Sequence, residues 1–137
     1  MKITKILSIA FAIALSLLLL QCTSDKKELH KELTRLAADL NQSTPMVLDA
    51  HMRFDSVGVS ADNIFGYYYT IASIDNPKEL IDDKRVEIVK EMDDALKTNR
   101  TLQFYIQNEV TFQYIYRDTL QNVIDVITIE TGKYKTK

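Results

Sequence analysis

Residues 110–117, VTFQYIYR, alternate between bulky apolar side chains and more polar ones at nearly every step. Successive side chains of a β-strand point to opposite faces of a sheet, so this alternation predicts a strand with one buried face. A turn at residues 118–122 and a second apolar segment at 123–131 follow, which predicts a neighbouring strand. The side chains expected on the buried face of the first strand are Val110, Phe112, Tyr114 and Tyr116.

An earlier part of the chain predicts a β-hairpin. Residues 49–60 and 64–73 are rich in β-branched and aromatic side chains, and the residues between them, Ala61-Asp62-Asn63, are typical of a turn. The apolar alternation changes phase after Ser56, because Val57 and Val59 occupy the opposite parity. A β-bulge near residues 55–56 would explain this change.

Two segments show the periodicity of helices. Residues 29–40 carry leucine and alanine at the spacing that gives a helix one apolar face, and residues 41–45 end the pattern. Residues 76–79, Asn-Pro-Lys-Glu, have the arrangement of a capping box with proline at the first helical position. They predict a second helix that continues to residue 97, with a short further turn at 102–106.

The predicted order of elements is therefore α-β-β-α-β-β, an α+β fold. Four antiparallel strands cannot bury their apolar face alone, so the two helices should cover one face of a four-stranded antiparallel sheet. We expect a single domain over residues 29–131, because 137 residues with 46% hydrophobic side chains suffice for one core. Residues 132–137 would form a polar C-terminal tail.

The first 21 residues have the layout of a signal peptide. A short basic stretch with Lys2 and Lys5 precedes an apolar run at residues 6–20. A helix that crosses a bilayer needs about 20 apolar residues, so a retained N-terminal signal anchor is the second interpretation. Cleavage after Ser24, which would release a soluble exported protein, is a third.

The end of this segment, Leu19-Leu20-Gln21-Cys22, resembles the lipobox of bacterial lipoproteins. The resemblance implies that Cys22 carries a lipid such as palmitate and becomes the mature N-terminus, with residues 22–28 as lipidated terminus and tether. Gln21 stands where that pattern has glycine, alanine or serine. Cys22 is the only cysteine, so no intrachain disulfide can form; a free thiol is the alternative. The implied location is the bacterial cell envelope, with the protein held to a membrane and facing the periplasm or the cell surface.

Charge and glycine content exclude several classes of partner. Removing residues 1–21 takes away two of the 17 basic residues and leaves 19 acidic ones, a formal charge of about −4. No basic cluster suggests nucleic-acid binding. The three glycines, Gly58, Gly66 and Gly132, lie too far apart for a nucleotide-binding loop. We therefore expect no cofactor and no nucleic-acid partner, and we identify no small-molecule substrate.

Four stretches in succession resemble a group of small exported bacterial proteins of uncharacterised function. The resemblance covers most of residues 33–130 and implies a fold and an envelope location. It carries no catalytic residues to transfer. The stretches are Pro45–Asp49, Arg53–Val57, Tyr67–Thr70 and Val110–Asp118.

A polar row is one candidate site. In a strand, Asp49, His51, Arg53 and Asp55 would share one face. Two carboxylates and an imidazole could bind a metal or transfer protons, whereas Arg53 between the acids favours a solvent-exposed row of ion pairs. We expect no metal site here. His30, on the first helix among charged residues, is expected in solvent.

The tyrosines are the other candidate, because this side chain is frequent where proteins meet. Tyr114 and Tyr116 share a face with Phe112 and are expected in the core. Tyr68 points away from its neighbours Tyr67 and Tyr69, so at least one aromatic ring should be exposed.

These observations favour a lipid-anchored envelope protein that binds another protein and is not an enzyme. An inhibitor or immunity-type lipoprotein is a narrower version of the same role. A hydrolase or metal-binding domain that uses Asp49, His51 and Asp55 is the remaining alternative.

Overall fold

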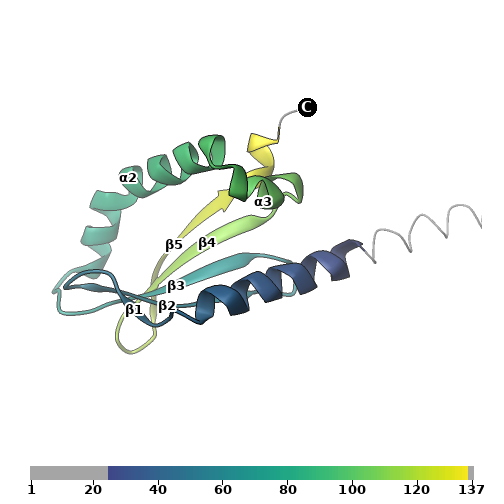
Figure 1. The fold of residues 1–137 in the computed structure, drawn as a ribbon. Coiled ribbons are helices and arrows are strands. Elements are labelled where there is room, and N and C mark those ends of the chain that lie inside the picture. The colour runs from purple at the N-terminus through teal and green to yellow at the C-terminus, as the bar shows by residue number, and fades with distance from the viewer. Residues whose placement is uncertain (1–24, 136–137) are drawn as a thin grey trace, which may run out of the picture.

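A computed structural model describes residues 25–135, which form an α+β fold (Figure 1). The first helix covers residues 25–41, and the other elements follow in alternating groups of strands and helices. They are β1 (Met46–Val47), β2 (Met52–Val59), β3 (Phe65–Ile71), α2 (Pro77–Thr98), the 3-10 turn η1 (Arg100–Leu102), α3 (Gln103–Gln107), β4 (Thr111–Arg117), β5 (Val123–Glu130) and the 3-10 turn η2 (Thr131–Tyr134).

The sheet has five strands in the order β1-β2-β3-β4-β5, and its central pair is parallel. The α+β class is confirmed, but the prediction of four antiparallel strands is wrong in two respects. β1 adds a strand, and β4 runs parallel to β3. The reason for the second difference is α2: its 22 residues span about 33 Å and return the chain to the end where β3 began. Such a crossover connection produces a parallel pair.

Helix 25–41 and α2 contribute to the same core (Figure 1). Leu33 from the first helix and Ile81 from α2 are buried in one cluster with Phe65 and Phe112 of the sheet. The buried face predicted for residues 110–117 is confirmed, because Val110, Phe112, Tyr114 and Tyr116 are all buried. The helices therefore cover one face of the sheet, as expected.

Two local predictions are also confirmed. The pairing of β2 with β3 shifts between Phe54 and Ser56, which is the predicted bulge, and it turns Val57 into the core. At the start of α2, the Asn76 side chain accepts the N–H of Glu79 at 3.4 Å and donates to the Glu79 carboxylate at 2.9 Å. Asn76 therefore caps α2 as predicted, but the Glu79 carboxylate binds the Asn76 side chain and not the backbone N–H that a standard capping box uses.

The outer edge of β2 is closed by two features that the sequence did not predict. β1 pairs with Phe54 and Arg53. Further along, the Asn41 amide nitrogen donates to the Val57 carbonyl at 2.8 Å, and its oxygen accepts the Val57 N–H at 2.7 Å. The Asn41 side chain thus takes the place of a neighbouring strand at Val57.

The ends of the described part differ from expectation. Residues 25–28, expected in a tether, belong to the first helix, and residues 132–134, expected in a tail, lie in η2. The predicted signal peptide and Cys22 fall outside the described residues. Within residues 25–135, none of the helices has the length and apolar character needed to cross a membrane.

Candidate functional site: a groove floored by tyrosines

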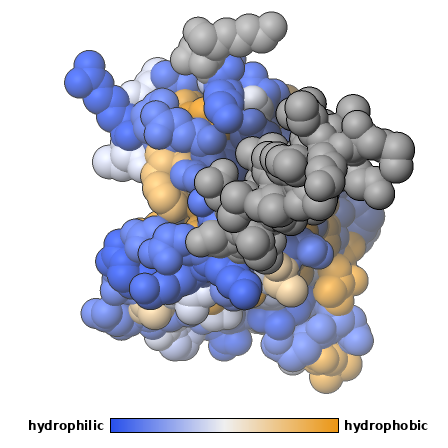
Figure 2. Space-filling view, turned by 90° about the vertical axis from the view of Figure 1, so that its right-hand side faces the viewer, coloured by the Kyte–Doolittle hydropathy of each residue, from blue (hydrophilic) through white to orange (hydrophobic). Residues whose placement is uncertain are grey.

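A groove of about 460 Å³ lies between α2 and the covered face of the sheet. Its floor is formed by Met52, Tyr69, Tyr114 and Tyr116, from three adjacent strands. Residues 84–92 of α2 supply one side, and Leu48 and Asp49 supply another. On the face at the right-hand end of Figure 1, apolar side chains lie between largely hydrophilic parts of the surface (orange and blue in Figure 2).

The floor tyrosines belong to a ladder of stacked rings that continues beyond the groove to Tyr67. Parallel pairing sets Tyr67 beside Tyr114 and Tyr69 beside Tyr116. The ring centroids of these pairs are 5.1 Å and 5.3 Å apart, with interplanar angles of 7° and 22°. Tyr114 and Tyr116 are buried, as predicted, whereas Tyr67 and Tyr69 remain half-buried. The ladder therefore belongs to the core and also reaches the surface.

The phenols of the ladder are neutral hydrogen-bonding groups. Burial raises the pKa of Tyr69 to about 12, and it raises the pKa values of Tyr67 and Tyr114 still further. The Tyr114 hydroxyl donates to the Met92 sulfur at 3.4 Å. Within residues 25–135, no partner accepts or donates to the hydroxyls of Tyr69 and Tyr116. Groups with such pKa values cannot serve as bases at neutral pH, but they can donate hydrogen bonds to a bound molecule.

Charged side chains line the mouth of the groove. Glu87 and Glu91 lie one turn apart on α2, and both are exposed. Asp49 accepts the backbone N–H groups of His51 and Met52 at 2.7 Å and 2.8 Å. These hydrogen bonds, together with the positive charge of Lys84, lower the pKa of the Asp49 carboxyl. The mouth is therefore negatively charged at neutral pH.

The predicted polar row does not form one site. β2 begins at Met52, so Asp49 and His51 precede the strand, and Asp49 caps the turn that leads into it. The His51 ring nitrogen lies 3.3 Å from the Ala72 carbonyl. Asp49, His51 and Arg53 line a small hollow of about 270 Å³, but the side-chain hydrogen bond within the row joins Arg53 Nε to Asp55 Oδ1 at 2.6 Å. In the described part of the chain, no group of three His, Cys, Asp or Glu side chains is arranged to hold a metal ion.

Asp55 is the centre of a network on the open face of the sheet. Besides Arg53, its carboxylate accepts the Thr70 hydroxyl at 2.6 Å and an Arg117 nitrogen at 3.4 Å. Burial acts to raise the pKa of Asp55, but the hydrogen bonds from Thr70 and Arg53 outweigh it, so the pKa is lowered. The Arg117 guanidinium lies 4.9 Å from the centre of the Tyr68 ring, a cation–π contact. These contacts hold strands together and leave no free acid for catalysis.

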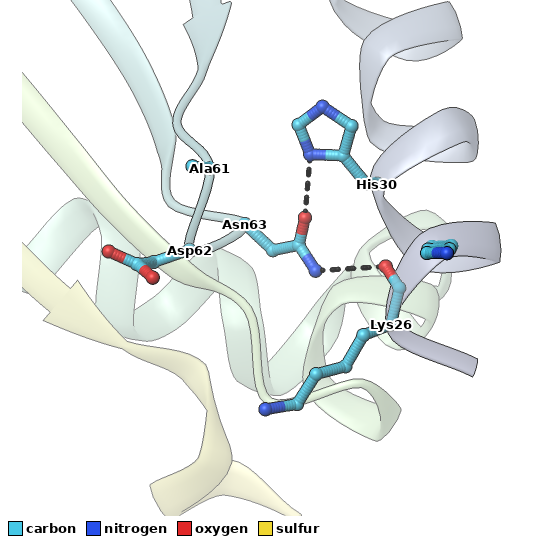
Figure 3. Close-up of a pocket in the computed structure, with 6 residues that line it drawn as sticks. Lys26, His30, Ala61, Asp62 and Asn63 are labelled. Carbon is cyan, nitrogen blue, oxygen red and sulfur yellow. Dashed lines mark hydrogen bonds between the residues drawn. The ribbon is translucent and has the colours of Figure 1, made fainter. Parts of the chain in front are cut away.

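A second hollow, of about 610 Å³, lies where helix 25–41 meets the β2–β3 turn (Figure 3). It is larger than the groove, and two of its polar side chains, His30 and Asn63, are bound within it. His30 Nδ1 lies 2.8 Å from Asn63 Oδ1, and the Asn63 amide donates to the Lys26 carbonyl at 3.2 Å. Asp62 points away from His30 (Figure 3). The expectation that His30 is merely solvated is therefore wrong: it helps to fix the helix to the hairpin.

A family model described as a domain of unknown function, DUF8479, matches residues 28–124. The chain belongs to this family. The match includes helix 25–41 from residue 28 onwards, both sides of the groove and the three tyrosines of its floor. A search of curated proteins found no match to the sequence.

Solved structures share the fold of this DUF8479 domain. A secreted protein of Pseudomonas aeruginosa is 13% identical, with a TM-score of 0.66 over 80% of this chain and 96% of that one. The type 2 secretion pilotin EpsS of Vibrio vulnificus is 12% identical, with a TM-score of 0.56 over 84% and 99%. The type II secretion pilotin AspS of Vibrio cholerae is 10% identical, with a TM-score of 0.53 over 80% and 95%. At these identities the likeness concerns the fold.

Sequence reasoning identified the tyrosines but not the groove. Met52, Ile88 and Met92 line it, yet in the sequence they are indistinguishable from core positions. One signal was available: Glu87 and Glu91 are spaced by four residues, a like-charge arrangement that weakens an isolated helix.

Proposed function

We propose that this protein is a lipid-anchored component of the cell envelope whose DUF8479 domain binds another protein in the groove and performs no catalysis. The observation that carries the proposal is the floor of stacked tyrosines, where the half-buried Tyr69 lines the groove beside the buried Tyr114 and Tyr116. Tyrosine offers a large rigid apolar surface together with a hydroxyl, and few rotatable bonds must be fixed when it binds.

The chemistry of the groove supports binding rather than reaction. Its hydroxyls belong to phenols that stay protonated at neutral pH, and the nearest carboxylate with a fixed geometry, Asp49, is occupied by backbone N–H groups. The polar row that could have supported a hydrolase is divided between a turn and an ion-pair network.

The envelope location rests on the N-terminal sequence and agrees with the fold relatives. Leu19-Leu20-Gln21-Cys22 supports lipid attachment at Cys22. The pilotins that share the fold belong to secretion systems, so we propose a partner that is itself a subunit of an envelope assembly. An inhibitor or immunity-type protein would use the same groove, and the identity of the captured partner would distinguish it.

The first helix would separate the anchor from the groove. Residues 25–41 span about 25 Å, and the hydrogen bonds of Asn63 fix the end of the helix that is nearer to Cys22. Leu48 and Asp49, at the mouth of the groove, follow the other end of this helix in the chain. The partner would then be bound at a distance from the membrane surface.

Photocrosslinking in the cells that produce the protein tests this function. A photoreactive residue at Ile88, in the groove, should form a crosslink to one protein. The same residue at Thr128, exposed on β5, is the matched control and should form none to that protein. Equal crosslinking from both positions, or none from Ile88, would refute the proposed function. Mass spectrometry of the mature N-terminus separately tests whether Cys22 is acylated.

A further inference from the structure

We propose that the groove selects an apolar segment that carries lysine or arginine side chains. This inference rests on the proposed function and specifies the chemistry of the partner. Three properties of the groove support it: adaptable apolar sides, a net negative mouth and a phenol at the floor whose hydroxyl is free to hydrogen-bond a ligand.

The sides of the groove suit aliphatic or aromatic side chains. Met52 and Met92 contribute flexible thioethers, which adapt to ligands of different shape. Ile88 lies between the charged residues of the same helix, and Leu48 remains 49% exposed opposite to it. An apolar segment that covered these four side chains would remove them from water, which is the main favourable contribution to association.

The mouth of the groove carries an excess of negative charge. Three carboxylates, those of Asp49, Glu87 and Glu91, line the groove together with one lysine, Lys84. Elsewhere on α2, Asp82 and Asp93 each form an ion pair with a lysine four residues away. Within residues 25–135, Glu87 and Glu91 form no such pair.

The repulsion between Glu87 and Glu91 destabilises α2, and a basic partner would relieve it. Two carboxylates four residues apart on a helix repel each other and weaken the helix. A lysine or arginine placed between them would turn that repulsion into attraction. An anionic partner, such as a nucleic acid or an acidic lipid surface, would increase the repulsion, so the charge favours a basic polypeptide.

The floor supplies a further point of recognition. Tyr116 is only 3% exposed and lines the groove, yet no residue in the described range of the chain hydrogen-bonds to its hydroxyl. The hydroxyl oxygen itself keeps contact with solvent, because Arg117 Nε is the only buried side-chain polar atom without a partner in residues 25–135. A carbonyl or N–H of a bound segment would replace that solvent as its hydrogen-bond partner.

Three synthetic peptides of equal length test the inference against the mature chain. The first combines leucine, alanine and lysine at the spacing of an amphipathic helix. In the second, glutamate replaces lysine; in the third, serine replaces leucine. Calorimetry should detect binding of the leucine–lysine peptide only, with an affinity that falls as salt is added because exposed charges are screened.

Charge reversal on α2 provides the decisive comparison. Glu87→Lys together with Glu91→Lys should weaken the leucine–lysine peptide by roughly tenfold, from the strength of two exposed ion pairs, and should permit the leucine–glutamate peptide to bind. The matched control is Asp83→Lys with Asp94→Lys, which makes the same charge change on exposed α2 residues outside the groove. It should retain the preference of the native protein.

Other outcomes overturn the inference and leave the proposed function separately testable. Equal loss of affinity in the two double variants would mean that binding reflects overall charge only. Binding of the leucine–glutamate peptide to the native protein, or of no peptide at all, would refute the proposed partner chemistry. Crosslinking from Ile88 would still report whether the groove is occupied in cells.

Discussion

Replacing Asp55 with asparagine should destabilise the domain by about 3 kcal/mol. The Asp55 side chain is 13% exposed and binds Arg53, Thr70 and Arg117. Arg117 is 21% exposed, and its Nε is buried without a partner within the described chain. Asparagine would leave this guanidinium without a counterion, and removing one partner of a largely buried pair costs about 3–5 kcal/mol. The lower end of that range applies because Arg53 and Arg117 keep partial access to water.

The free energy of unfolding, measured by urea titration monitored by circular dichroism, checks this magnitude. Asp82→Asn is the matched control, because Asp82 is 50% exposed and pairs with Lys78 on the surface. An exposed pair contributes about 0–1 kcal/mol, so the control should change little. A loss below about 1 kcal/mol for Asp55→Asn, or equal losses for both variants, would refute the reasoning, since such values are those of surface pairs.

The same network predicts a dependence on pH. The folded-state pKa of Asp55 lies below its usual value, so its contribution to stability is fully present above the unfolded pKa of about 3.9 and is lost as pH falls through the lower folded pKa. The native protein should therefore lose more stability than Asp55→Asn between neutral pH and acid. Parallel stability curves for the two proteins would contradict the assignment.

Three more substitutions test other parts of the structure. Asn41→Ala should cost about 2 kcal/mol in urea unfolding, because the buried Val57 loses both side-chain hydrogen bonds; a cost near zero would show that water replaces them. Gly66→Ala should cost about 1–3 kcal/mol, since a Cβ there would lie 3.1 Å from Ile115 Cδ1, and Ile115→Val should recover part of the loss. His51→Ala should change thermal stability by less than about 0.5 kcal/mol and leave metal content, measured by mass spectrometry, unaltered; a loss of bound metal would restore the metal-site hypothesis.

The order of elements was predictable because each element carries its own local signal. Alternation over residues 110–117 indicated β4, and the Asn76 capping box indicated the start of α2. The parallel pairing of β3 with β4 was not predictable in this way. It depends on where α2 ends relative to the start of β3, which is a property of the packed fold and not of either strand. β1 was not predicted, because a strand of two residues is too short to show an alternating pattern.

The site was likewise predictable only where a local sequence pattern determines it, and not where it depends on how the strands pack. Alternation placed Tyr114 and Tyr116 on a buried face, but which tyrosines stack on which follows from the direction of β3. The prediction of one polar row was wrong for a different reason. Alternate residues share a face only inside a strand, and the Asp49 side chain stabilises a turn before β2 begins. Short polar side chains compete with regular backbone pairing in this way.

The closure of β2 by β1 and Asn41 gains importance if the protein is held on a membrane. Lipid attachment would confine many copies to a thin layer, where exposed strand edges meet far more often than in free solution. Long unpaired edges promote aggregation between sheets. Asn41 occupies the Val57 backbone, and at the opposite edge Asp125 accepts the N–H of Val126. These contacts would disfavour edge-to-edge pairing of crowded copies at Val57 and at Val126.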